Sequence, residues 1–239
     1  MQYCTYIIGI SLLSVNSFAE PACQPVDTLS AHYQVTTNNS KAEKPSKVVV
    51  LRQGNQVAYR YESAAITELW EHTSNNRVRL VRYFDQYKRG VEYQPNEVKH
   101  HQNWSIKTSL ISQSLLNSTT NTTHDSQDCD TITQHQGQHN KQLFSVKWHP
   151  RYQLPTDFTV SDDQGHLISQ WTLLDIKTDK NDINTALSQF DQYQTTDYTD
   201  IGDSESDPFL RKMIHLGFID HGHSGVYDAA GNSLDHPAH

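Results

Sequence analysis

The sequence predicts an α+β protein built mainly from antiparallel β-strands, with helices covering one face of the sheet. Two patterns support this. Apolar and polar residues alternate over most of residues 31 to 97, and three later segments carry helical spacing or helix-cap residues. Alternation with a period of two is typical of a strand with one buried and one solvated face, because successive side chains point to opposite sides.

The first group of predicted strands forms a meander. Val57, Tyr59 and Tyr61 alternate with smaller or more polar neighbours, and Gly54-Asn55 before them predicts a hairpin turn. Short turns of this kind join antiparallel neighbours. The other strands predicted in this half of the chain are Lys47–Arg52, Ile66–Trp70, Val78–Phe84 and Val91–Tyr93.

A helix is predicted to follow the meander and to cover its apolar side. Asn103 is a suitable N-cap, and Trp104, Ile111 and Leu115 are spaced to share one face of a helix that ends near Leu116. Residues 117 to 139 are polar and show no period, so we predict a mobile loop there.

Strands resume in the second half of the chain and are followed by two helices. Helical spacing predicts the first helix over Asp182–Tyr193, and the second combines Asp207 as N-cap, Pro208 in the first turn and Gly217 at the stop. The strands predicted here are Phe144–Trp148, Phe158–Val160 and Leu167–Trp171.

This order of elements resembles a known family. The segment that runs from Val146 through Leu154-Pro155 to Leu173 is similar to the late hairpins of the LolA/LolB-like periplasmic lipoprotein carriers, and the resemblance covers roughly residues 26 to 180. It implies a curved, unclosed β-barrel-like sheet whose apolar surface under the helices holds an acyl chain. No family motif matches position by position, so the resemblance assigns no binding residue.

The N-terminus has the pattern of an export signal. An apolar run ends before Ser17-Phe18-Ala19, whose small residues fit a signal-peptidase site, and the run is too short to span a bilayer. A buried N-terminal strand is the alternative. We therefore predict a signal peptide over residues 1–19, a β-rich domain over 20–197, and an acidic linker, short helix and His-rich tail over 198–239. The mature protein is predicted to be periplasmic or secreted.

The cysteines agree with export. Cleavage after Ala19 leaves only Cys23 and Cys129, and two distant cysteines in an oxidising compartment most simply form one disulfide. A free buried thiol or a pair of metal ligands is the alternative.

Charge and motifs exclude several functions. A net charge of −8 does not fit nucleic-acid binding, and no later segment is apolar enough to span a membrane. The sequence contains neither a G-x-S-x-G nucleophile elbow nor an H-E-x-x-H metal motif. We therefore expect no enzyme activity and no cofactor.

Strand aromatics are the candidate ligand-binding residues. Most should belong to the core, but in a curved sheet several could line a site for an apolar or amphipathic small molecule. They are Tyr59, Tyr61, Trp70, Phe84, Trp148 and Trp171.

The tail offers a candidate metal site. His221 and His223 form an H-x-H pair that suits Zn, Cu or Ni, with His215 as a third ligand. A solvated tract without fixed geometry is the alternative. The acidic segment Asp197–Asp207 could hold Ca²⁺ but lacks EF-hand spacing, and helix capping explains it more simply.

The leading interpretation is a non-catalytic periplasmic binding or carrier-like protein for an apolar or amphipathic ligand, with an envelope protein as another possible partner. A metal-binding accessory protein is the first alternative, and a hydrolase with an unrecognised site is the second.

Overall fold

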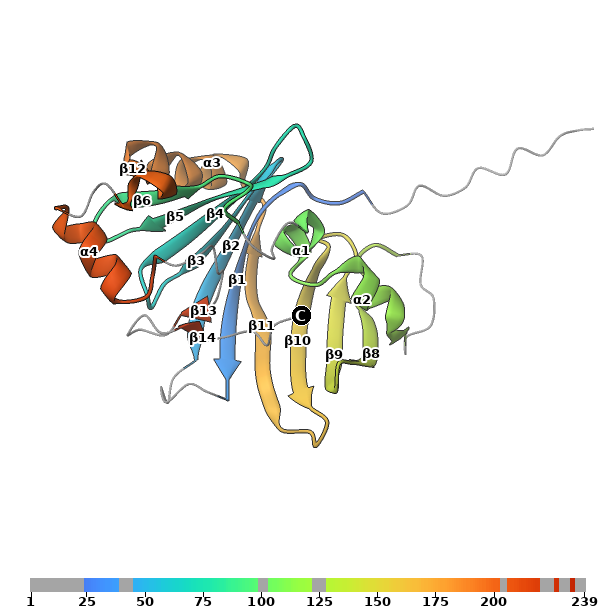
Figure 1. The fold of residues 1–239 in the computed structure, drawn as a ribbon. Coiled ribbons are helices and arrows are strands. Elements are labelled where there is room, and N and C mark those ends of the chain that lie inside the picture. The colour runs from blue at the N-terminus through green and yellow to red at the C-terminus, as the bar shows by residue number, and fades with distance from the viewer. Residues whose placement is uncertain are drawn as a thin grey trace, which may run out of the picture.

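Twelve strands form one open sheet in the computed structural model, which describes residues 24–38, 45–98, 103–121, 128–202, 206–219, 226–227 and 233–234 (Figure 1). The order across the sheet is β12-β6-β5-β4-β3-β2-β1-β11-β10-β9-β8-β7. The strands are β1 (Thr28–Thr37), β2 (Ser46–Gln53), β3 (Gln56–Tyr61), β4 (Ile66–His72), β5 (Val78–Phe84), β6 (Arg89–Tyr93), β7 (Thr120–Asn121), β8 (Thr133–His139), β9 (Gln142–His149), β10 (Leu154–Asp162), β11 (Leu167–Lys177) and β12 (Gln194–Asp197).

Antiparallel pairing dominates this sheet. Every pair of neighbours from β6 to β7 is antiparallel, and only β12 lies parallel to its neighbour β6. The strand order begins at β12 and ends at β7 without joining them, so the sheet is not closed. The predicted fold class, mainly antiparallel with a curved and unclosed sheet, is confirmed.

Four α-helices and two 3₁₀ turns accompany the sheet. They are α1 (Trp104–Ser109), α2 (Gln113–Ser118), α3 (Lys180–Ser188), η1 (Gln189–Gln192), η2 (Tyr198–Asp200) and α4 (Pro208–His215). None of these helices is long and apolar enough to cross a membrane, within the part of the chain that the structure describes. Val226–Tyr227 (β13) and Ser233–Leu234 (β14) form a separate antiparallel pair.

Apolar residues at consecutive positions of the meander, rather than strict alternation, give the sheet two apolar faces. We call the face that carries Tyr59 and Trp70 the inner face; it holds the main core and is covered by α1, α2 and α4 (Figure 1). The outer face carries Val49 and Leu51, and α3 packs on it through Ile183. Because period-two alternation places neighbours on opposite faces, apolar residues at consecutive positions serve two separate cores.

The helix predicted from Trp104 to Leu116 is wrong in one respect: it is two short helices. Asn103 caps α1 as expected and accepts from the backbone N–H of Ser105. Leu110 then adopts a left-handed conformation with φ of 64°, which ends α1. Ser112 starts α2 afresh by accepting from the N–H of Leu115.

The loop predicted over residues 117 to 139 is also wrong for its described part. β8 pairs with β9 along its length, and β7 pairs with β8. The segment Thr133–His139 is polar on both faces, so apolar alternation could not reveal it; its strand conformation depends on the backbone partner that β9 supplies.

The two later helices lie close to their predicted positions. α3 begins two residues early because Asp179 is its N-cap, and η1 continues the turn. α4 has the predicted cap: Asp207 accepts from the N–H groups of Phe209 and Leu210. Leu210, in the short helix predicted between the acidic linker and the His-rich tail, packs into the same core as the sheet.

Candidate functional site

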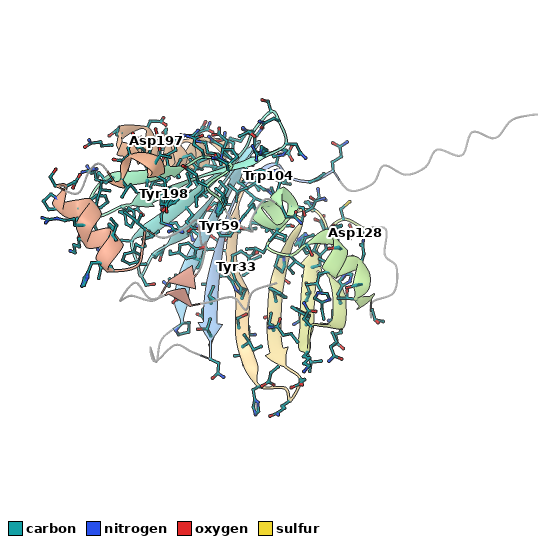
Figure 2. All side chains as sticks on the ribbon, viewed as in Figure 1. Tyr33, Tyr59, Trp104, Asp128, Asp197 and Tyr198 are labelled. Atoms are coloured by element: carbon teal, nitrogen blue, oxygen red, sulfur yellow. The ribbon has the colours of Figure 1, made fainter. Side chains whose placement is uncertain are left out.

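The six predicted ligand-binding aromatics gather on one core. Tyr59, Tyr61, Trp70, Phe84 and Trp171 are between 0% and 7% exposed, and Trp148 is half-buried against them. Tyr33, which the sequence analysis did not single out, joins the same wall and meets Trp171 edge to face at 5.7 Å. Figure 2 shows Tyr33 and Tyr59 on the central strands and Trp104 at α1. Their role as ligand contacts stays a prediction.

A buried ion pair interrupts this aromatic wall. Arg82 on β5 pairs with Glu68 on β4 at 2.7 Å, and the two side chains are 1% and 0% exposed. Arg82 also donates to the carbonyl oxygen of Phe218, just after α4, at 2.5 Å. The second carboxylate oxygen of Glu68 is buried and meets no hydrogen-bond partner in the described part of the chain.

Sequence reasoning missed this pair, although the chain carries a signal for it. Glu68 stands between Ile66 and Trp70, at a position where the alternation calls for an apolar residue, and Arg82 is its cross-strand partner. Two opposite charges at apolar positions of neighbouring strands predict a buried ion pair.

A third charge comes from α1. Lys107 is the buried residue of this helix, and its Nζ lies 3.5 Å from the centre of the Trp70 ring. Burial lowers the pKa of Lys107 to about 8, while the nearby Glu68 carboxylate acts in the opposite direction. The cation–π contact supplies part of the stabilisation that water would otherwise give the ammonium.

Two side chains of the sheet hold the end of α1. The Tyr59 hydroxyl donates to the carbonyl of Lys107 at 2.6 Å, and Arg52 donates through Nη1 to the carbonyl of Thr108 at 2.7 Å. The last carbonyls of a helix lack partners within the helix, so these bonds satisfy them. Burial raises the pKa of Tyr59, so its hydroxyl keeps the donated proton.

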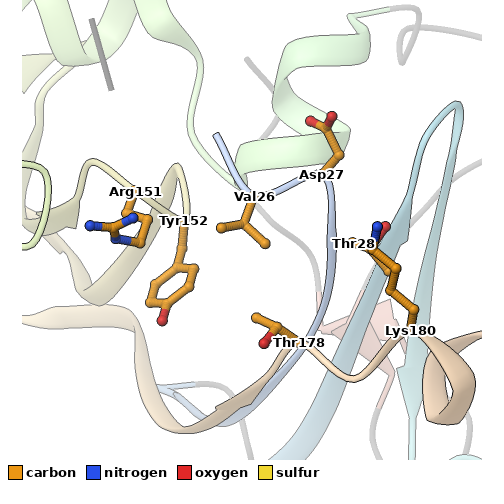
Figure 3. Close-up of a pocket in the computed structure, with 7 residues that line it drawn as sticks. All are labelled: Val26, Asp27, Thr28, Arg151, Tyr152, Thr178 and Lys180. Atoms are coloured by element: carbon orange, nitrogen blue, oxygen red, sulfur yellow. The ribbon is translucent and has the colours of Figure 1, made fainter. Parts of the chain in front are cut away.

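A pocket opens beside this attachment point. It has a volume of about 480 Å³, within the usual range for small-molecule sites. Val26, Asp27 and Thr28 line it from the start of β1, and Arg151 and Tyr152 from the turn before β10. Thr178 and Lys180 complete the lining from the segment that joins β11 to α3 (Figure 3). We call it the mouth pocket.

Arg52 lies against the wall of the mouth pocket. Its Nη2 donates to the carbonyls of Val26 at 2.7 Å and of Tyr152 at 2.6 Å. Burial lowers the pKa of Arg52, and Asp27 is the main charge that opposes this shift. The same guanidinium therefore contacts the pocket wall and the end of α1.

The predicted disulfide has support from its described neighbours. Arg151 accepts a backbone hydrogen bond from Val26 and donates one to the carbonyl of Cys129, at 3.0 and 3.1 Å. Cys23 precedes Val26 by only three residues, a reach of about 10 Å at most. Cys23 itself lies outside the described residues, so the pairing with Cys129 stays a prediction.

The predicted metal site is not tested. His215 is exposed in the last turn of α4, while His221 and His223 lie outside the described residues. Within the described ranges, no three His, Cys, Asp or Glu side chains come together as a metal site. In the acidic segment, Asp207 caps α4 and pairs with Arg89 at 2.9 Å, which lowers the pKa of Asp207.

Comparisons with known proteins identify no family. Searches against protein families and curated proteins give no match. Similar solved structures include PNGF-II (10% identity, TM-score 0.37), an uncharacterized conserved protein from Thermus thermophilus (11%, 0.34) and MucB (11%, 0.33). The matches cover 72%, 72% and 67% of this chain, and 31%, 91% and 58% of those chains. The chain therefore spans about a third of PNGF-II. MucB also occurs in a complex with MucA from Pseudomonas aeruginosa. All these TM-scores lie below 0.5, so they assign no ligand or partner to this chain.

Proposed function

We propose that this protein is a non-catalytic, carrier-like binding protein whose apolar or amphipathic ligand lies between the aromatic wall of the inner face and the α1–α2 cover, residues 103–118. The observation that carries the proposal is the way this cover is held. An open sheet with a buried aromatic face lies beneath two six-residue helices, and hydrogen bonds from Tyr59 and Arg52 attach the end of the first, α1, to the sheet.

The α1–α2 cover has the properties of an element that opens. Isolated helices shorter than about 12–15 residues are marginal in water, and α1 and α2 have six residues each. The buried residues of the two helices are Lys107 and Leu116, and between the helices Ile111 is 2% exposed. Elements with few buried apolar contacts open locally at lower free energy than the core. The left-handed Leu110 between the helices supplies a joint.

The charged groups support binding rather than catalysis. Glu68 and Arg82 are paired and almost fully buried, so neither is placed to meet a substrate in solution. We propose the absence of catalysis on this basis. We also propose a LolA/LolB-like fold and an extracytoplasmic location, which the open antiparallel sheet and the N-terminal leader pattern support.

A fluorescence titration tests the proposal. The neutral probe N-phenyl-1-naphthylamine emits strongly in apolar sites, and the four tryptophans of the chain all belong to or pack against the inner-face core. We expect saturable one-to-one binding with emission sensitised by tryptophan, and displacement of the probe by decanol.

Ile214→Gln is the matched control, because Ile214 is 48% exposed on α4, outside the site. This variant should bind N-phenyl-1-naphthylamine with the same affinity as the wild type. Binding that fails to saturate, or that Ile214→Gln abolishes, would contradict a site beneath α1 and α2.

A further inference from the structure

The geometry points to an anion-binding site in the mouth pocket: we infer that the polar end of the ligand is an anionic group, a carboxylate or a phosphate ester, held beside Arg52 and Lys180. This inference rests on the proposed function, since it assigns the chemistry of the ligand's head while the inner face takes its apolar part.

The first support is a buried cation without a hydrogen-bonded carboxylate. Arg52 is 5% exposed, and its described partners are three neutral carbonyls. Its Nε is buried and has no hydrogen-bond partner among the described residues. Burying a guanidinium is costly unless a counter-charge lies close by, and neutral carbonyls supply only dipoles. Asp27, an exposed carboxylate that accepts no printed hydrogen bond from Arg52, is the main counter-charge, and an anion in the pocket would add a second.

The second support is the charge of the pocket lining. Lys180 lines the pocket and forms no ion pair with any described residue, whereas Arg151 is already paired with Asp130. Asp27 is the carboxylate of the lining. Asp27 balances Lys180 within the lining, and Arg52, which lies behind the pocket wall on the carbonyls of Val26 and Tyr152, adds one positive charge beside it.

The third support is the polarity and continuity of the pocket. The hydroxyls of Tyr152 and Thr178 make no hydrogen bond to described residues and can donate to an anion, and both side chains face the pocket that Val26 also enters (Figure 3). Val26 and Tyr152 also pack against the inner-face core. The pocket thus combines polar and cationic side chains with two residues that also contact the apolar core, which fits an amphipathic molecule.

Matched ten-carbon probes test the inference by calorimetric titration into the purified protein. Decanoate and decanol share a chain and differ in charge, and inorganic phosphate carries the charge without a chain. We expect decanoate to bind about tenfold more tightly than decanol, a typical gain for hydrogen bonds to a charged group. The preference should shrink as salt rises, because exposed charges are screened.

Substitutions locate the effect. Lys180→Gln should weaken decanoate binding by about three- to fivefold without changing decanol binding, as expected for a solvent-exposed ion pair. Asp27→Asn should strengthen decanoate binding by a similar factor. Lys177→Gln, three residues away and outside the pocket lining, is the control and should change neither affinity.

The outcomes separate the two proposals. Equal affinities for decanoate and decanol would overturn the anion site and leave the binding function standing. Phosphate binding without binding of either ten-carbon probe would overturn the binding function and leave the anion site standing. A preference for decanoate that survives Lys180→Gln and Asp27→Asn unchanged would place the anion elsewhere and overturn the assignment to the mouth pocket.

Discussion

The inner face has two covers that differ in their balance of apolar and polar contacts. Both have some of each: the carbonyl of Phe218, just after α4, accepts from Arg82, and Ile111 and Leu116 of the α1–α2 cover are buried. The α4 cover, residues 207–219, buries Leu210, Met213 and Phe218 in the main core and brings Phe209 edge to face with Phe84 at 5.4 Å. In the α1–α2 cover, α1 instead buries a lysine and ends on hydrogen bonds to Tyr59 and Arg52.

This difference assigns the two covers different roles. Apolar burial stabilises at roughly 25 cal/mol per Å² and resists opening, whereas a buried hydrogen bond contributes about 1 kcal/mol net and can be exchanged for water. Under the proposed function, we therefore expect the α4 cover to stay closed and the α1–α2 cover to be the side through which a ligand enters.

The largest expected effect concerns the ion pair beneath α4. Glu68→Gln deprives the buried Arg82 of its carboxylate, so the free energy of unfolding should fall by about 3–5 kcal/mol in urea titration. Glu71→Gln is the control, because its pair with Arg79 is about one third exposed, and its loss should stay below about 1 kcal/mol. Equal losses of unfolding free energy in the two variants would contradict a larger contribution from the buried pair.

The next effect tests the apolar attachment of α4. Met213 is 2% exposed, so Met213→Ala should cost about 2–5 kcal/mol of unfolding free energy through lost burial and a residual cavity. Its neighbour Ile214 is 48% exposed, and Ile214→Ala should stay within about 0.5 kcal/mol. Similar small losses in both variants would mean that α4 is only loosely docked.

Titration of Lys107 tests the polar attachment of α1. Its folded pKa of about 8 lies below the unfolded value of 10.5. Between these values the unfolded chain holds the proton and the folded protein does not, so stability should rise with pH by up to about 1.4 kcal/mol per unit, or about 3 kcal/mol over the window.

Lys107→Met should lack this rise and should be more stable than the wild type near pH 7. The buried tyrosines, whose raised pKa values reduce stability above about pH 10, remain in both proteins and cancel in the difference. A wild-type and variant difference that stays constant from pH 7 to 10 would contradict a depressed pKa at Lys107.

The smallest effect concerns the rate of opening. Tyr59→Phe removes a hydrogen bond to α1, which should raise the open fraction about fivefold, since such a bond contributes about 1 kcal/mol. Stopped-flow entry of N-phenyl-1-naphthylamine should accelerate accordingly. Tyr33→Phe removes a similar buried bond to Pro155 on β10 rather than to a cover, so its entry rate should not change. Equal acceleration of probe entry in both variants would contradict a specific role for the Tyr59 hydrogen bond in holding α1 closed.

The sequence revealed the apolar pattern of this molecule more fully than its polar contacts. Alternation around Tyr59 and Trp70 located the meander, and Asp207 with Pro208 located α4. β8 was missed because its stability comes from backbone pairing with β9, which polar side chains do not record. The break at Leu110 depends on one left-handed residue that has no glycine signature.

In the candidate site, too, the apolar part could be predicted from the sequence and the polar part could not. The aromatic wall could be predicted because its members alternate along strands. The mouth pocket could not, because it joins residues near Val26, Tyr152 and Lys180, which only the pairing of β1 with β11 and the turn before β10 bring together. Arg52 ended a predicted strand with no sign that its guanidinium would be buried under three carbonyls.

Hydrogen exchange of the two covers tests the central claim most directly. In the native protein, amides of residues 103–118 should exchange through local openings well below the free energy of global unfolding, while amides of α4 should exchange near the global value. Saturating decanoate should slow exchange in the first segment and leave α4 almost unchanged. Exchange of both covers at one common rate, with no local protection by decanoate, would contradict the account.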